Sequence, residues 1–253
     1  MEKIKIPNSK GKNIAAVIHY PEKPTDRLAI LCPGYLDSKD YKHMVGLAEA
    51  LSKKEYTVIR FDPTGTWESE GDIYEYTTTQ CLLDIKSIID YLSPRGVFTC
   101  LLLGGHSRGG MISILYAAHN PRVSAVLAIM PSSPYSMSGK NRDEWQKNGF
   151  SLSQRNIPDR NEKKEFRVPY SHAQDNDQYN VIDDVKMVKV PIVFLAGTLD
   201  EVVLPENVKR IFNNANEPKK YILMEGIGHD YRYNQSEVEA VNNKILEALS
   251  EIL

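Results

Sequence analysis

A serine enclosed by glycines constrains the fold of this chain more than any other stretch. The segment LLLGGHSRGG (residues 101–110) places an apolar run directly before a G-x-S-x-G pattern centred on Ser107. The apolar run predicts a buried strand, and the periodicity of residues 111–119 predicts a helix after it. A serine on a sharp turn between a strand and a helix needs neighbours that lack a Cβ. The stretch therefore predicts a nucleophile elbow that projects the hydroxyl of Ser107.

The rest of the chain alternates between short apolar runs and segments of helical period. An alternating hairpin is expected first, at residues 3–6 and 13–20. Runs apolar on both faces predict buried parallel strands at residues 28–32, 57–61, 99–105, 123–130, 191–197 and 219–225. Helices are expected at residues 41–54, 79–92, 111–119, 205–214 and 237–253. This alternation predicts an α/β fold built on a doubly wound, mostly parallel sheet.

One segment, residues 132–185, breaks this rhythm. It is polar, shows no buried strand and is too long for an ordinary connection. Its scattered aromatic residues favour a folded helical cap over the strand ends, rather than a disordered surface insertion. We therefore expect a core domain formed by residues 1–131 and 186–253, with residues 132–185 as the cap. The aromatic residues are Tyr135, Trp145, Phe150, Phe166, Tyr170 and Tyr179.

Ser107 needs a base, and His229 is the best placed of the six histidines. His229 follows the last predicted strand, at the edge of the sheet where sites form in this architecture. The other histidines lie in the N-terminal hairpin, at helix ends, in the elbow or in the cap. The acid is expected after the preceding strand, where Asp200 lies three residues past Gly197, with Glu201 as its nearest rival. The sequence thus predicts the chain order Ser107, Asp200, His229.

An oxyanion hole requires two backbone N–H groups. One is expected from Arg108, which follows the nucleophile, and the other from Tyr35 in the loop after an early strand. The ring of Tyr35 would then border the acyl pocket, and we expect Trp145 and Tyr135 of the cap to contact substrate as well. Aromatic side chains there favour an apolar or aromatic substrate group. For the Arg108 side chain, a salt bridge near the site is expected more than contact with an anionic substrate.

Composition excludes several other classes of protein. The 31 basic and 33 acidic residues give a net charge of −2, so neither a nucleic acid nor an anionic membrane is an expected partner. No apolar run reaches about 18 residues and the N-terminus lacks the apolar core of a signal peptide, so no membrane span is expected. The three cysteines are not in metal-binding spacing, which favours a reduced cytoplasmic setting. No metal constellation or phosphate loop is apparent, so no cofactor is expected, and nothing in the sequence sets the oligomeric state.

These residues together resemble the α/β-hydrolase family. The stretches that match are Pro33-Gly34-Tyr35, Gly105-His106-Ser107-Arg108-Gly109-Gly110, Gly197–Asp200–Val203 and Gly228-His229. Within the family, the compact size and the cap position are similar to bacterial feruloyl or cinnamoyl esterases and to monoacylglycerol-lipase-like enzymes. One departure is that Thr66 and Trp67 replace the His and Gly of the family's G-H-G-x-S stretch. Either that loop follows a different path or Trp67 projects toward the cap.

The resemblance and the triad lead us to expect a serine hydrolase. It would cleave small-molecule carboxylic esters, with small or aromatic acyl groups, through an acyl-enzyme on Ser107. A thioesterase, a peptidase or a carbon–carbon hydrolase on the same triad is the alternative. A non-catalytic ligand-binding homologue is a further alternative, because a fold alone does not establish activity.

Overall fold

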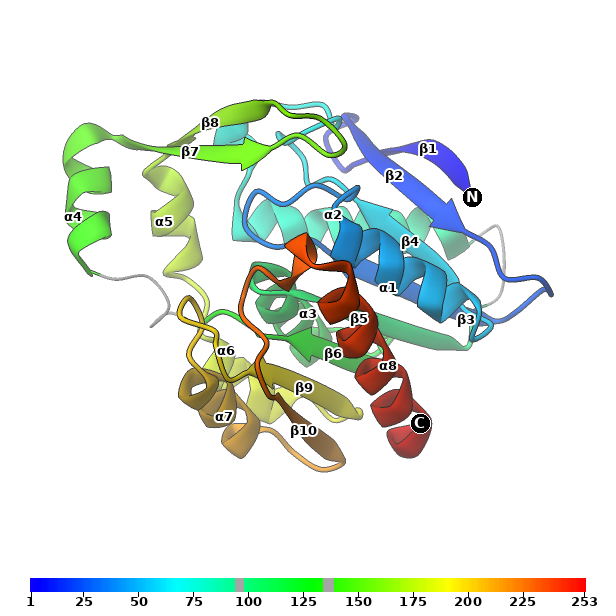
Figure 1. The fold of residues 1–253 in the computed structure, drawn as a ribbon. Helices are drawn as coiled ribbons and strands as arrows, with labels where there is room; N and C mark the ends of the chain where they lie inside the picture. The colour runs from blue at the N-terminus through cyan, green and yellow to red at the C-terminus, as the bar shows by residue number, and fades with distance from the viewer. Residues whose placement is uncertain (94–97, 134–138) are drawn as a thin grey trace.

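An eight-stranded sheet runs through the protein in the computed structural model, which describes residues 1–93, 98–133 and 139–253 (Figure 1). Its strands lie in the order β1-β2-β4-β3-β5-β6-β9-β10. Strands β1 and β2 pair antiparallel, β2 pairs antiparallel with β4, and the remaining neighbours are parallel. The mostly parallel sheet expected from the sequence is thus confirmed. The strands are β1 (Glu2–Pro7), β2 (Asn13–His19), β3 (Arg27–Cys32), β4 (Thr57–Phe61), β5 (Cys100–His106), β6 (Ala125–Ile129), β9 (Ile192–Gly197) and β10 (Lys219–Met224).

Helices cover both faces of the sheet (Figure 1). Helices α1 (Lys42–Ser52) and α8 (Gln235–Ile252) pack on one face, and their apolar stripes form one buried cluster with that face. The other face is covered by α2 (Thr78–Leu92), α3 (Arg108–His119) and α7 (Pro205–Asn214). Successive strand residues point to opposite faces, so a strand between two helical layers is apolar along most of its length.

Strand β9 illustrates this two-sided burial. Val193 belongs to the cluster beneath α1 and α8, whereas Phe194 belongs to the cluster on the opposite face. Both are almost completely buried. This explains why the central strands appear in the sequence as continuous apolar runs rather than as alternating patterns.

The insertion between β6 and β9, here called the cap, combines helices with an antiparallel hairpin. Its elements are α4 (Gly139–Asn148), β7 (Phe150–Asn156), β8 (Lys163–Pro169), α5 (Ser171–Asn176), α6 (Val181–Asp184) and the short 3-10 helix η4 (Val185–Met187). The sequence prediction of a helical cap is therefore incomplete. In β8, Phe166 and Val168 are buried while the alternating charged residues Glu165 and Arg167 are exposed, which is the period-two pattern of a half-buried strand. The domain limits at residues 132 and 185 stay a prediction.

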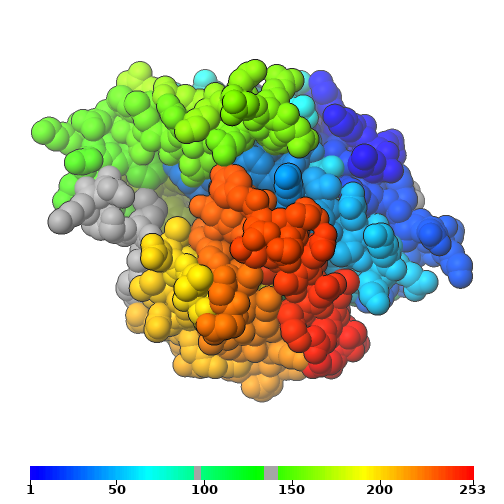
Figure 2. All heavy atoms as spheres, in the orientation of Figure 1, coloured from blue at the N-terminus to red at the C-terminus, as the bar shows by residue number. Residues whose placement is uncertain are grey.

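The cap lies along one side of the core, beside the segment that carries residues 226–236 (Figure 2). The indole of Trp67 packs edge-on against Phe166 of β8, with 5.3 Å between ring centroids, and its Nε1 donates to the carbonyl of Leu36 at 3.0 Å. Of the two alternatives for the loop that departs from the family pattern, projection of Trp67 toward the cap is the one observed. The backbone N–H of Thr79 on α2 also donates to the Asp175 carboxylate of α5 at 3.0 Å.

Within the described ranges, no helix is long and apolar enough to cross a membrane.

Replacing Phe194 with alanine is expected to lower the free energy of unfolding by about 3–5 kcal/mol. The substitution removes a completely buried side chain of β9 and leaves a cavity in the core. Leu223→Ala, at a side chain 52% exposed on β10, is the matched control and should change it by less than about 1 kcal/mol. Urea denaturation measures both values. Equal losses in the two variants would contradict the assignment of β9 to the core.

Candidate active site

Ser107 occupies a strained turn between β5 and α3. Its backbone has φ +55° and ψ −119°, a conformation that L-residues rarely adopt. The turn is held on both sides: the N–H of Ser107 donates to the carbonyl of Ile129 at 2.8 Å, and its own carbonyl accepts from the N–H of Ser132 at 3.1 Å. The predicted nucleophile elbow is therefore present as a strand, a strained turn and a helix.

The glycines on either side of the elbow are required by the end of β3. A Cβ on Gly105 would lie 2.2 Å from the carbonyl oxygen of Cys32, and a Cβ on Gly109 would lie 2.0 Å from the same atom. Neither contact is sterically tolerable, because the obstacle is backbone rather than a side chain that can turn away. The clash with the Cys32 carbonyl explains why Ser107 is flanked by glycines.

The structure brings the three predicted triad residues together. Nε2 of His229 lies 3.0 Å from Oγ of Ser107, and Nδ1 of His229 lies 2.8 Å from Oδ2 of Asp200. The other carboxylate oxygen of Asp200 accepts the backbone N–H groups of Val202 and Val203 at 2.9 and 2.7 Å. Asp200 is buried, whereas the rival Glu201 is exposed.

This chain of hydrogen bonds determines the protonation pattern. A carboxylate only accepts hydrogen bonds, so in the neutral imidazole the proton lies on Nδ1 of His229, which donates to Asp200. Nε2 of His229 then presents a lone pair to the hydroxyl of Ser107. The arrangement can remove a proton from Ser107 and keep the resulting imidazolium beside a buried negative charge.

The two predicted oxyanion donors lie on either side of the elbow. Tyr35 follows β3, and its carbonyl accepts from Arg155 of β7 at 3.4 Å. In the part of the chain that the structure describes, the N–H groups of Tyr35 and Arg108 take no part in the turn, loop or cap hydrogen bonds between backbone atoms. Their role in an oxyanion hole stays a prediction.

The side chain of Arg108 forms no salt bridge with any of the described residues, so that expectation was wrong. It is 4% exposed, and its guanidinium donates to Sγ of Cys81 at 3.2 Å and to Oγ1 of Thr78 at 3.3 Å. The guanidinium also lies over the ring of Tyr76, 4.6 Å from its centroid. Sulfur, hydroxyl and π contacts thus replace the expected carboxylate.

Aromatic rings from the core and the cap meet near Tyr35. The imidazole of His172, on α5, lies 5.3 Å from the ring of Tyr35 and stacks on Tyr76 at 5.1 Å. Trp145, on α4, stacks on the other side of His172 and donates from Nε1 to the carbonyl of Val168. Trp145 is 6% exposed, and substrate contact by Tyr35 and Trp145 stays a prediction. Tyr135 lies outside the described residues.

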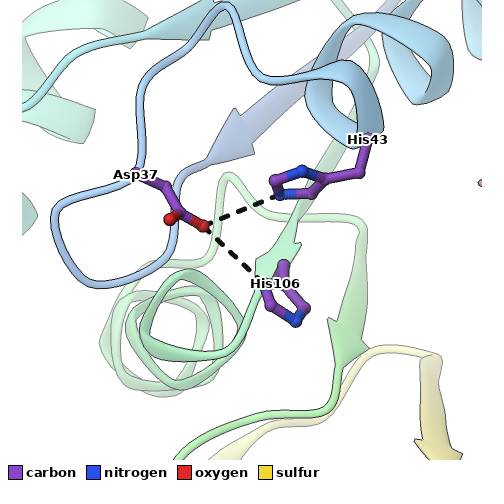
Figure 3. A group of neighbouring side chains, drawn as sticks. All are labelled: Asp37, His43 and His106. Carbon is purple, nitrogen blue, oxygen red and sulfur yellow. Dashed lines mark ion pairs between the residues drawn. The ribbon is translucent and has the colours of Figure 1, made fainter. Parts of the chain in front are cut away.

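A buried cluster beside the triad was missed by the sequence analysis (Figure 3). The carboxylate of Asp37, in the loop after β3, points toward His43 of α1 and His106 of β5, with 3.8 Å to a nitrogen of each ring. These three side chains could offer ligand atoms to a metal ion. However, the guanidinium of Arg232 already contacts both oxygens of Asp37, at 3.2 and 3.3 Å, and would repel a divalent cation there. No local pattern links residues so far apart in the chain.

Burial controls the protonation of this cluster. It lowers the pKa of His43 to about 3 and that of His106 to about 4, the latter with a contribution from the neighbouring His229. Burial alone would raise the pKa of Asp37, but the adjacent His106 and Arg232 hold it below its usual value. Near pH 7 the cluster therefore contains one carboxylate, one guanidinium and two neutral imidazoles.

Comparisons with known proteins identify the fold family of the chain. The sequence matches the model of a family described as alpha/beta hydrolase fold over residues 29–167, more than half of the chain. It is 25% identical over 210 residues to the mitochondrial palmitoyl-protein thioesterase ABHD10 of Mus musculus, covering 81% of this chain and 69% of that protein. The Rattus norvegicus counterpart is also 25% identical, and there the match spans 59% of the relative's length.

Solved structures share the fold along nearly the whole chain. Est1E from Butyrivibrio proteoclasticus, determined with ferulic acid bound, superposes with a TM-score of 0.78 at 20% identity and covers 98% of both chains. Alpha/beta hydrolase domain-containing protein 10 from mouse superposes with a TM-score of 0.78 at 21% identity and covers 100% of both chains. The hydrolase GrgF from Penicillium sp. sh18 gives 0.82 at 17% identity, over 99% of this chain and 98% of that one.

The stability of the protein is expected to fall as pH is lowered from about 6.5 to 5. Burial lowers the pKa of His172 to about 3, whereas an unfolded histidine titrates near 6.5. Over this range the unfolded state binds more protons, so each such histidine costs up to about 1.4 kcal/mol per pH unit. His19, His43 and His106 are shifted in the same direction.

Urea denaturation at a series of pH values measures this dependence. His172→Gln removes one of these groups and should reduce the slope of unfolding free energy against pH. An unchanged slope in that variant would show that His172 is not held neutral in the folded protein.

Proposed function

Because this chain belongs to the alpha/beta hydrolase fold family, we propose that it is a serine hydrolase that cleaves carboxylic esters through an acyl-enzyme on Ser107. The observation that carries the proposal is the continuous hydrogen-bond chain from Ser107 through His229 to Asp200, with distances of 3.0 and 2.8 Å. A serine hydroxyl is a weak nucleophile until a base removes its proton, and this chain supplies that base.

The proposed reaction has two halves. Oγ of Ser107 attacks the ester carbonyl while its proton passes to Nε2 of His229, and Asp200 stabilises the imidazolium. His229 then gives the proton to the departing alcohol, which leaves an acyl group on Ser107. In the second half a water molecule, deprotonated by His229, attacks that acyl group. The bond between the acyl group and Oγ breaks, His229 returns the proton to Oγ of Ser107, and the carboxylic acid is released.

The negative charge that develops on the carbonyl oxygen needs preorganised donors. We assign this role to the backbone N–H groups of Tyr35, in the loop after β3, and of Arg108, the first residue of α3. Loss of one such donor from a site of this kind costs about 3–4 kcal/mol of transition-state stabilisation. Rings of Tyr35 and Trp145 in the surrounding cluster favour small or aromatic acyl groups.

Thioester hydrolysis is a second candidate, and the curated relatives favour it. The mouse relative, 25% identical over 81% of this chain, is a palmitoyl-protein thioesterase. An acyl-enzyme on Ser107 serves both reactions, and they differ in whether the leaving group is an alcohol or a thiol. Peptide or carbon–carbon bond cleavage would use the same triad. A complete triad argues against a binding protein that lacks activity.

A cytoplasmic location is part of the proposal. The three cysteines, Cys32, Cys81 and Cys100, are free thiols in the structure, and free thiols persist in reducing compartments. The curated relatives are named as mitochondrial proteins.

Ser107→Ala is expected to lower kcat for 4-nitrophenyl esters by at least about a thousandfold, because no other group replaces the nucleophile. It should also abolish labelling by a fluorophosphonate probe. The control Ser250→Ala, at an exposed position on α8, should retain full activity and labelling. Turnover by Ser107→Ala at the parental rate would overturn the proposed function.

A panel of substrates with one acyl group and different leaving groups separates the two candidates. For a short-chain, an aromatic and a palmitoyl acyl group in turn, we expect kcat/KM to be higher for the oxygen ester than for the thioester. A preference for the thioester of the same acyl group by tenfold or more would replace the esterase assignment with the thioesterase one.

A further inference from the structure

A buried ion pair joins the two loops that carry the active-site groups. Asp37 lies two residues after Tyr35, and Arg232 lies three residues after His229. Nη1 of Arg232 is 3.2 Å from Oδ1 and 3.3 Å from Oδ2 of Asp37. The pair thus connects the loop of the proposed oxyanion donor with the loop of the base, although 195 residues separate them in sequence.

Arg232 makes further contacts with residues other than Asp37. Its Nη2 lies 2.7 Å from the Asp230 carboxylate, and the guanidinium lies 5.0 and 5.1 Å from the ring centroids of Tyr41 and Tyr233. The Arg232 side chain is 12% exposed, compared with 4% for Asp37. An ion pair so far removed from water is screened little by salt.

The other titratable groups that face Asp37 do not balance its charge. His43 and His106 flank the carboxylate at 3.8 Å, but no nitrogen of either ring has a hydrogen-bond partner among the described residues. Both rings are neutral near pH 7 because burial opposes their protonation. Arg232 therefore supplies the counter-charge for Asp37.

Asp37 also contacts the peptide that leads into Tyr35. Its N–H donates to the carbonyl of Gly34 at 3.2 Å, and a Cβ on Gly34 would lie 2.6 Å from Oδ2. The carboxylate is thus packed directly on the backbone whose next N–H belongs to Tyr35.

The same cluster supports the loop of the base. The ring of His106 lies 4.5 Å from the ring of His229, between centroids. Tyr231, two residues after His229, packs edge-on against His43 and His106 at 5.7 and 5.6 Å. The backbone that follows His229 is therefore anchored, through Tyr231, to the histidines that also surround Asp37.

We propose that Asp37 and Arg232 form a positioning pair that holds the N–H of Tyr35 in place for the carbonyl oxygen and the imidazole of His229 in place for the hydroxyl of Ser107. This inference rests on the proposed function. Asp37 is buried, and among the described residues the pair makes no hydrogen bond to Ser107. We therefore expect it to act on the transition state rather than on substrate affinity. A displacement of about 1 Å in such a site can cost about a hundredfold in rate.

The test is Asp37→Asn, which keeps the shape of the side chain and removes its charge. At the plateau of the pH–rate profile we expect kcat for a 4-nitrophenyl ester to fall about tenfold to a hundredfold, with KM within about twofold of the parent. The rate of fluorophosphonate labelling at Ser107 should fall by a similar factor. Arg232→Lys retains the positive charge and should lose less activity than Arg232→Met.

Asp84→Asn is the matched control for loss of a buried carboxylate. Asp84 lies on α2, is fully buried and accepts hydrogen bonds from Thr64 and Gln80, without reaching the loop of His229. Both variants are expected to lower the melting temperature, but Asp84→Asn should keep the parental kcat and labelling rate. A purely structural role for Asp37 predicts the same outcome in both.

The possible results separate this inference from the proposed function. Equal kcat and labelling rates in the parent and Asp37→Asn overturn the inference and leave the proposed function intact. A proportional rise in KM with unchanged kcat also overturns it, because the pair would then act on affinity. Absence of labelling at Ser107 in the folded parent overturns the proposed function and, with it, the inference.

Discussion

The close approach of β3 to the nucleophile elbow is the constraint on which the rest of the site depends. The carbonyl of Cys32 occupies the space that a Cβ on Gly105 or Gly109 would need, so the strand end and the turn must be built together. Pro33 to Tyr35 continue directly from that strand end. One contact therefore fixes the direction of the Ser107 hydroxyl and the starting point of the loop that carries the proposed oxyanion donor.

Much of this site could be predicted from the sequence because its signals are local. Ser107 and Asp200 each follow a buried strand, and parallel strands bring their carboxyl ends to one edge of the sheet. His229 follows β10, which was expected to be buried but is half-buried, because it lies at the edge of the sheet. The geometry that joins them needed no information beyond strand positions and residue type. The long apolar runs predicted the central strands equally well, since burial between two helical layers favours apolar residues on both faces of a strand.

The parts that could not be predicted depend on contacts between distant segments. Strand β8 alternates charged and apolar residues because it is half-buried, and this gives a weak signal in a polar segment. The environment of Arg108 depends on α2, where Cys81 and Thr78 offer sulfur and hydroxyl acceptors instead of a carboxylate. The contact between Asp37 and Arg232 joins two loops that share no local pattern.

An acyl group on Ser107 is the intermediate that the proposed hydrolase reaction requires. Acid quenching of the protein during turnover of a 4-nitrophenyl ester, followed by peptide mapping in a mass spectrometer, detects it directly. We expect the acyl group on the peptide that contains Ser107, in an amount that approaches one per protein molecule when deacylation is slow. Turnover accompanied by an acyl group on a different residue would contradict it.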